Sequence, residues 1–118
     1  MIKGELHMTY EEIVAQAKEI AEKKDASSYK GHLAVQINIE GEGSGIYYVE
    51  IRDGKVDVQP YDYLDRDCIL IATADVLTKI LEGSMDAVGA FLSGKLKVEG
   101  SVDKALEFQN LLKSPDKK

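Results

Sequence analysis

The stretch of sequence that decides the fold is AFLSGKLKVEG, residues 90–100. Charged and apolar side chains alternate over residues 95–99, so that Leu96 and Val98 share one face of an extended segment. A glycine at each end of this segment favours a change of chain direction, because glycine adopts positive φ angles without strain. The stretch therefore predicts an edge-type strand that follows one helix and precedes another.

Three helices are predicted around this strand in the C-terminal third of the chain. Apolar side chains recur at helical spacing over residues 76–82, 85–92 and 102–113. Each range follows a side chain that accepts a hydrogen bond from the free N–H groups of a first helical turn, and Gly83 suits the end of the first helix. The predicted N-terminal caps are Thr73 or Asp75, then Ser84, and finally Ser101.

The N-terminal part of the chain predicts one helix followed by four strands. Thr9 and Glu12 form the capping-box pattern at the start of that helix. The first strand alternates as a half-buried strand does, whereas the fourth is continuously apolar and is expected to be central or buried on both faces. The predicted strands are residues 33–40, 46–52, 55–59 and 68–72, with a tight turn at Asp53-Gly54. The resulting order, α-β-β-β-β-α-α-β-α, is typical of an α+β fold.

The composition argues against several classes of function. The chain has 118 residues, with 15 Lys and Arg against 21 Asp and Glu. This acidic balance argues against binding to nucleic acid and against an electrostatic membrane anchor, since both need an excess of basic side chains. One cysteine and two histidines are too few for a disulfide framework or a structural zinc site.

The ends of the sequence set the expected domain boundaries. No apolar run approaches the ~18–20 residues of a membrane-spanning helix, and the first residues lack the apolar core of a signal peptide. We interpret residues 1–8 as a leader or a disordered N-terminus, residues 9–113 as a single domain and residues 114–118 as a polar tail.

Candidate catalytic and cofactor sites are weak in this sequence. Gly41–Gly45 could cradle a phosphate, but a strand follows these glycines, whereas phosphate loops lead into a helix, so a hairpin turn is the preferred interpretation. The acidic loop at residues 62–67 lacks the spaced oxygen ligands of a calcium site. Cys68 lies within an apolar strand, where burial raises a thiol pKa and makes it unreactive. We therefore expect neither enzymatic activity nor a cofactor or metal.

Four segments of the chain carry a family resemblance: DCILI at residues 67–71, ADVLTKILEG at 74–83, the stretch at 90–100 and KALEFQ at 104–109. Together they resemble the C-terminal half of the sterol carrier protein 2 family. The first half of the chain resembles this family in element order alone. Ser84-Met85 stands where the family often carries Asn-Pro, and the peroxisomal tail of eukaryotic members is missing. The resemblance thus indicates a stand-alone, prokaryotic-type member, for which cytoplasmic localisation is expected.

This resemblance implies a fold and a function. The implied fold is a five-stranded, mostly antiparallel sheet that helices cover on one face, with an apolar tunnel between them. The implied function is non-enzymatic binding, and in some members transfer, of fatty acids, fatty acyl-CoA, sterols or other hydrophobic molecules. The expected partner is a hydrophobic small molecule, with transient contact with a membrane, no nucleic acid, and a monomeric or weakly dimeric state.

Apolar side chains on the helices and on the sheet are the candidates for lining the tunnel, although a lining residue and a core residue share the same chemistry. Gln109 is a candidate polar contact near the tunnel mouth, a surface amide being its other interpretation. Lys95 and Lys97 could meet an anionic head group or simply be solvated. The predicted lipid-binding residues are Ile13, Ala17, Val35, Ile37, Tyr48, Ile80, Leu81, Met85, Val88, Phe91, Leu92, Ala105, Phe108, Gln109 and Leu112.

A second hypothesis uses the same fold in a different way. If the cavity is collapsed, the apolar groove becomes a surface for dimerisation or for contact with an enzyme to which the domain is an accessory. The sequence does not separate this interaction module from a lipid binder, because both need exposed apolar side chains.

Overall fold

The computed structural model describes residues 9–113 except residues 28 and 63, so the predictions for residues 1–8 and 114–118 lie outside the described part. The element order and the α+β class agree with the sequence prediction. The helices are α1 (Tyr10–Lys23), α2 (Ala74–Glu82), α3 (Ala87–Leu92) and α4 (Val102–Leu112). The strands are β1 (His32–Glu40), β2 (Gly45–Arg52), β3 (Lys55–Gln59), β4 (Cys68–Thr73) and β5 (Lys97–Gly100).

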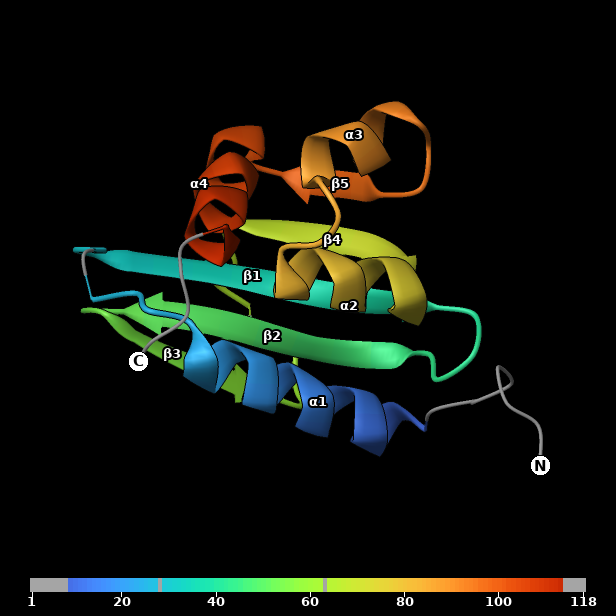
Figure 1. Ribbon diagram of the computed structural model, residues 1–118, viewed down its shortest axis with the longest axis horizontal. Helices are drawn as coiled ribbons and strands as arrows, with labels where there is room; N and C mark the ends of the chain where they lie inside the picture. The colour runs from blue at the N-terminus through green and yellow to red at the C-terminus, as the bar shows by residue number, and fades with distance from the viewer. Residues whose placement is uncertain (1–8, 28, 63, 114–118) are drawn as a thin grey trace.

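The five strands form one sheet in the order β3-β2-β1-β4-β5. Strands β1 and β4 are parallel, and the other three neighbouring pairs are antiparallel. All four helices lie on the same side of this sheet, with α1 over β2 and β3 and the remaining helices toward β4 and β5 (Figure 1). The predicted arrangement, a mostly antiparallel sheet covered on one face, is therefore confirmed.

Most helix caps and turns form at the residues where the sequence predicted them. The capping box closes at α1, where the Glu12 N–H donates to Thr9 Oγ1 at 3.1 Å and the Thr9 N–H donates to Glu12 Oε1 at 2.8 Å. Asp53 and Gly54 have φ angles of 51° and 83°, as a two-residue hairpin turn requires. These contacts join residues close in sequence, which is why sequence alone was enough to place them.

The start of α3 differs from the prediction. Ser84 was expected to cap this helix, but the N-cap is Asp86, whose side chain accepts from the Gly89 N–H. Ser84 instead completes the end of α2, because its N–H and its hydroxyl both donate to the carbonyl of Lys79. A residue that closes one helix is not free to open the next, so α3 begins two residues later than predicted.

Strand β1 is buried on both faces, contrary to the prediction of a half-buried strand. Val35 and Ile37 face the helices, and the alternate residues Ala34 and Gln36 are also buried, with exposed fractions of 0% and 5%. The order of the strands explains this burial. The connection from β3 to β4 must cross β2 and β1, and it contacts β1 through a hydrogen bond of 2.8 Å from the Ala34 N–H to Asp67 Oδ2.

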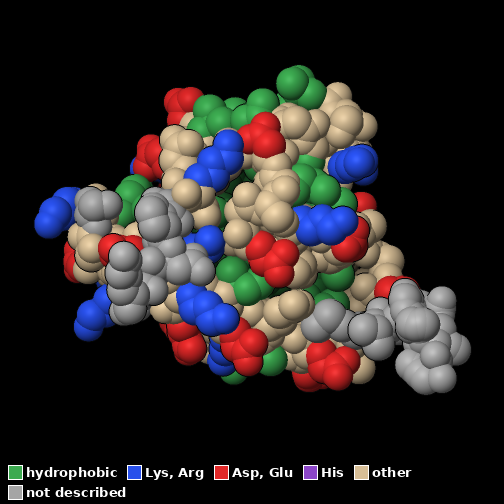
Figure 2. All heavy atoms as spheres, viewed as in Figure 1, with side chains coloured by type: hydrophobic (Ala, Val, Ile, Leu, Met, Phe, Trp, Pro, Cys, Tyr) green, Lys and Arg blue, Asp and Glu red, His purple; other side chains and the backbone are tan. Residues whose placement is uncertain are grey.

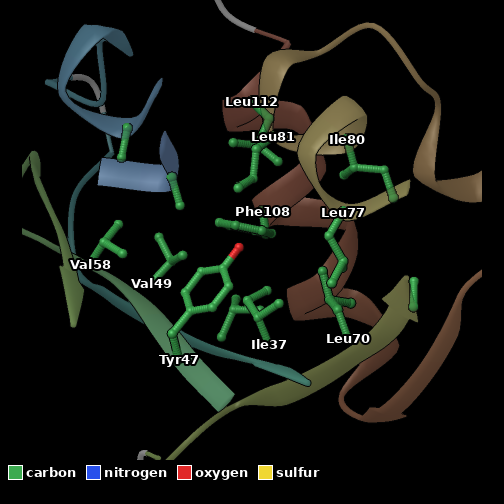
Figure 3. Packing of buried hydrophobic residues seen from close by; sticks show 14 of the residues in the cluster. Ile37, Tyr47, Val49, Val58, Leu70, Leu77, Ile80, Leu81, Phe108 and Leu112 are labelled. Atoms are coloured by element: carbon green, nitrogen blue, oxygen red, sulfur yellow. The ribbon is translucent and has the colours of Figure 1, made fainter. Parts of the chain in front are cut away.

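The hydrophobic core lies between the sheet and the helices (Figure 3). Tyr47 on β2 and Phe108 on α4 are the largest fully buried side chains, each 1% exposed. Val49 and Ile37 lie beside them on the helix-covered face of the sheet. Cys68 faces the same side from β4, where it is also 1% exposed. Phe108 therefore packs α4 against the centre of the core.

Gly100 is the glycine whose replacement is expected to disturb the fold most clearly. Its φ angle is +88°, and an added Cβ would lie 2.8 Å from the carbonyl oxygen of Asp67 and 3.0 Å from Cys68 Cα. We predict that Gly100→Ala lowers the free energy of unfolding by about 2–4 kcal/mol, because positive φ and backbone overlap both oppose a side chain here. Urea unfolding followed by circular dichroism measures the change.

Gly94→Ala is the matched control for this substitution. Gly94 has a similar φ of +83°, but nothing lies within 4 Å of its added Cβ. In this variant the free energy of unfolding should fall only by the cost of placing a side chain at a positive φ angle, about 1 kcal/mol. Equal losses in the two variants would show that the approach of β4 to Gly100 does not constrain the fold.

Candidate functional site

An apolar cavity of about 250 Å³ lies between α3, α4 and the end of the sheet formed by β4 and β5. Every lining side chain except that of Gln109 is apolar. The lining residues are Leu70, Ile80, Ala87, Val88, Phe91, Leu92, Leu96, Val98, Val102, Ala105, Leu106, Phe108 and Gln109. A space with this lining favours a hydrophobic ligand and offers little to a charged one.

The segment that opens the sequence analysis supplies one side of this cavity. Leu96 and Val98 point inward, as their alternation predicted, and Leu96 is 3% exposed. The short helix α3 faces them and buries only Ala90. The remaining apolar side chains of α3 therefore border the cavity or solvent instead of filling a core.

The mouth of the cavity is an apolar rim that is open to solvent. Leu92, Val102 and Phe91 are 78%, 56% and 48% exposed, and all three line the cavity. Figure 2 shows hydrophobic side chains gathered at the upper edge of this face, over α3 and α4. Exposed apolar side chains that are continuous with an apolar cavity are a feature of binding surfaces.

Gln109 is buried and structural, so its interpretation as a surface amide is wrong. It is 6% exposed, and its Oε1 accepts hydrogen bonds from the N–H groups of Ala87 and Val88. These are free donors in the first turn of α3, which a helix cannot satisfy internally. Gln109 therefore fixes α3 to α4 while its side chain forms part of the cavity wall.

Asp86 provides a second polar link between α3 and α4. Its carboxylate accepts from the ammonium of Lys113 at 2.9 Å and from the Gly89 N–H at 2.9 Å. The hydrogen bond from Lys113, together with the one from Gly89, lowers the pKa of Asp86 below its ordinary value. The carboxylate is thus ionised at neutral pH and keeps its capping role.

The predicted lining residues fall into four groups. Those that border the cavity are Ile80, Val88, Phe91, Leu92, Ala105, Phe108 and Gln109. Those that border a smaller hollow of about 20 Å³, which also touches Phe108, are Leu81 and Leu112. Those buried in the core but outside the lining of either space are Ile13, Ala17, Val35 and Ile37. Outside both linings are the half-buried Met85, which packs against the core, and Tyr48.

Tyr48 faces away from the helices, because it alternates with the buried Tyr47 on β2. The sequence predicted that these two tyrosines point to opposite faces, and the structure assigns the helix-covered face to Tyr47. The lining residues that the prediction did not include are Leu70, Ala87, Leu96, Val98, Val102 and Leu106. Leu96 and Val98 had been placed inward, so their alternation was the signal that pointed to the cavity.

Cys68, the single cysteine of the chain, lies outside the lining of this cavity and is unreactive. Cys68 is 1% exposed, and burial together with the nearby carboxylate of Asp67 raises its pKa to about 11. Such a thiol is protonated at neutral pH and does not act as a nucleophile. Within residues 9–113, residues 28 and 63 aside, no group of three or more His, Cys, Asp or Glu side chains could hold a metal ion. No described helix is long and apolar enough to cross a membrane.

Comparison with known proteins gives a family and several relatives. Residues 11–113 match the model of the SCP-2 sterol transfer family. Sterol carrier protein 2 of Oryctolagus cuniculus is 38% identical over 72 residues, which is 60% of this chain and 13% of the relative. The chain therefore spans only a small part of the length of the relative that it matches.

Two solved structures share the fold. Sterol carrier protein 2 of Aedes aegypti in complex with palmitate, a C16 fatty acid, has a TM-score of 0.60 at 18% identity, over 93% of this chain and 99% of that one. The sec-alkylsulfatase Pisa1 from Pseudomonas sp. has a TM-score of 0.69 at 22% identity, over 80% of this chain and 15% of that one. The fold thus occurs both by itself with a bound fatty acid and within an enzyme.

The contact between Gln109 and α3 leads to a prediction. Gln109→Met keeps the length of the side chain but removes the acceptor, leaving two partly buried N–H groups without a protein partner. We expect the free energy of unfolding to fall by about 1–3 kcal/mol. Hydrogen exchange at the Ala87 and Val88 amides should become faster.

Gln109→Glu is the control, because it restores an acceptor oxygen beside the positive end of α3. In this variant the backbone amides of Ala87 and Val88 should remain protected from hydrogen exchange. Unchanged exchange in Gln109→Met would show that this hydrogen bond does not hold α3 in place.

Proposed function

Because this chain belongs to the SCP-2 sterol transfer family, we propose that it binds a hydrophobic small molecule, such as a fatty acid, a fatty acyl-CoA or a sterol-like lipid, without chemically changing it. The observation that carries this proposal is the cavity, whose lining side chains are apolar except for Gln109. The Gln109 amide oxygen is already engaged by α3, so the protein offers no reactive group there.

Apolar burial alone gives such a site its affinity. Each methylene group moved from water into an apolar cavity contributes about 0.8 kcal/mol, so a long acyl chain needs few polar contacts. The lining is mainly aliphatic with two phenylalanines, which accommodates chains of different shape. We infer that the cavity selects ligands by their size and hydrophobicity and does not strictly recognise one head group.

The exposed rim supports a further part of this proposal, the exchange of lipid with a membrane. A lipid that leaves a bilayer through Leu92, Phe91 and Val102 stays in contact with apolar surface on its way to the cavity. The net charge of −6 opposes lasting attachment to an anionic bilayer. The exposed Lys95 and Lys97 place positive charge on the segment that supplies Leu96 and Val98 to the cavity. Because the chain as a whole is acidic, we expect any membrane contact to be transient.

The same rim also favours a second candidate function, an interaction module. Leu92 is 78% exposed, and the fold occurs within a longer enzyme. In this role the rim contacts a second copy of the chain or an associated enzyme. Concentration-dependent sedimentation, together with the absence of co-purifying lipid in mass spectrometry, would favour this function over lipid binding.

A cavity-filling substitution tests lipid binding. Ala105 is half-buried in the cavity wall, so Ala105→Phe should occupy the space that an acyl chain needs. We expect delipidated wild-type protein to bind a fluorescent fatty acid saturably at micromolar concentration, and Ala105→Phe to weaken this binding by roughly tenfold or more, equivalent to about 1.4 kcal/mol.

Ala15→Phe is the matched control, since Ala15 is an exposed residue of α1 outside the cavity lining. It should bind the probe as wild type does, and thermal melting confirms that both variants are folded. Absence of saturable binding of fatty acid, acyl-CoA and sterol probes to the wild type would contradict the proposed function.

A further inference from the structure

The inner end of the cavity is closed by buried side chains. Its mouth lies between exposed residues such as Leu92 and Val102, whereas Leu70, Ile80 and Phe108 line it and are buried. These three buried residues, which we call the inner wall, come from β4, α2 and α4 respectively. A ligand that enters at the mouth therefore meets the inner wall at the end of its path.

The space behind the inner wall is too small to lengthen the cavity. Phe108 also borders the smaller hollow of about 20 Å³, which Val49 and Leu81 line as well. A water molecule takes up roughly 30 Å³ in the liquid, and a methylene group is of similar size. The hollow does not hold even a single methylene group, so the path of a ligand ends at Phe108 in this direction.

The volume of the cavity limits the length of chain that it can enclose. At the size of a methylene group, about 250 Å³ corresponds to about eight carbon atoms of a chain. Pockets that enclose most of a drug-sized ligand commonly measure roughly 300–1,000 Å³. The C16 fatty acid bound to the relative from Aedes aegypti has about twice as many carbon atoms as this cavity can take. A long acyl chain would therefore be enclosed only in part.

The polarity of the lining determines which end of a ligand enters first. The side-chain oxygen of Gln109 already accepts hydrogen bonds from Ala87 and Val88, and the inner wall is apolar. A carboxylate at the inner wall would lose its hydration without gaining a cation. The methyl end of the chain therefore enters first, and the charged group stays in water at the mouth. Any further carbon atoms lie against the exposed rim, where they remain partly hydrated.

We propose that the site selects lipids with a medium-length chain of about eight to ten carbon atoms, and that Ile80 sets this limit. This inference rests on the proposed lipid-binding function. Leu70 lies on a strand that is paired on both sides, and Phe108 fills the core, whereas Ile80 closes the cavity on the side of α2. A longer chain still binds, but its additional methylene groups contribute little affinity because they stay outside the cavity.

A series of saturated fatty acids from hexanoate to hexadecanoate tests the limit, by displacement of a fluorescent fatty acid from delipidated wild-type protein. Up to decanoate, each added methylene group should tighten binding roughly threefold to fourfold, as its transfer from water into an apolar cavity predicts. From decanoate to hexadecanoate, each added methylene group should change binding by less than about 1.5-fold, since it no longer enters the cavity.

Ile80→Ala tests which residue sets the limit. It removes about three methyl-sized groups from the inner wall, and because such a site collapses in part, the limit should move to chains about two carbon atoms longer. The ratio of dodecanoate affinity to decanoate affinity should therefore rise from about twofold or less in the wild type to roughly tenfold in the variant. This ratio compares two ligands on one protein, so a general loss of stability does not change it.

Ile37→Ala is the matched control, because it shortens the same side chain at a buried core position outside the lining of both spaces. It should keep the limit of the wild type, and thermal melting shows whether both variants are folded. If either alanine variant does not fold, Ile80→Val and Ile37→Val repeat the comparison with a smaller truncation, and the expected shift is then about one carbon atom.

The outcomes separate this inference from the proposed function. If the wild type binds neither the probe nor any member of the series, lipid binding itself fails. If it binds them and the gain in affinity continues through hexadecanoate, lipid binding stands and the chain-length limit is overturned. If the limit is present but the Ile80 and Ile37 variants both keep it, or both shift it equally, the role of Ile80 is overturned.

Discussion

The hydrogen bonds from the first turn of α3 to the Gln109 side chain are the interaction on which the cavity depends. Helix α3 has six residues and buries only Ala90, so hydrophobic packing alone holds it weakly. The Gln109 side chain accepts hydrogen bonds from two N–H groups of α3. At the start of α3, the Asp86 carboxylate also accepts from the ammonium group of Lys113 at the end of α4. Because polar contacts secure the helix, its apolar side chains remain available to line a space.

Phe108 divides the interior into packed and open regions. On one side it meets the sheet residues that form the core, and on the other it borders the main cavity. A core of this kind is closely packed, and a space next to it persists only where no side chain reaches. Here the six-residue α3 and the small side chains of Ala87 and Ala105 leave that space open.

Prediction from sequence succeeded where the cause was local. The capping box at Thr9 and the cap at Ser101 join residues three positions apart, and both were placed correctly. Of the two caps predicted for α2, Thr73 and Asp75, the structure selects Thr73. It failed at Ser84, where the end of one helix competes for the residue that would begin the next. It also failed at Gln109, since glutamine is mostly exposed and only a distant helix end explains its burial.

The sequence by itself determined the order of elements, the α+β class and the family, because hydrophobic periodicity, caps and the stretch at residues 90–100 are properties of neighbouring residues. Only the tertiary structure decided which apolar residues line the cavity and which fill the core. Ile80 and Ile37 have the same side chain, yet one borders the cavity and the other packs within the core. The difference arises from how α3 and α4 are held above the sheet, and no single segment encodes that arrangement.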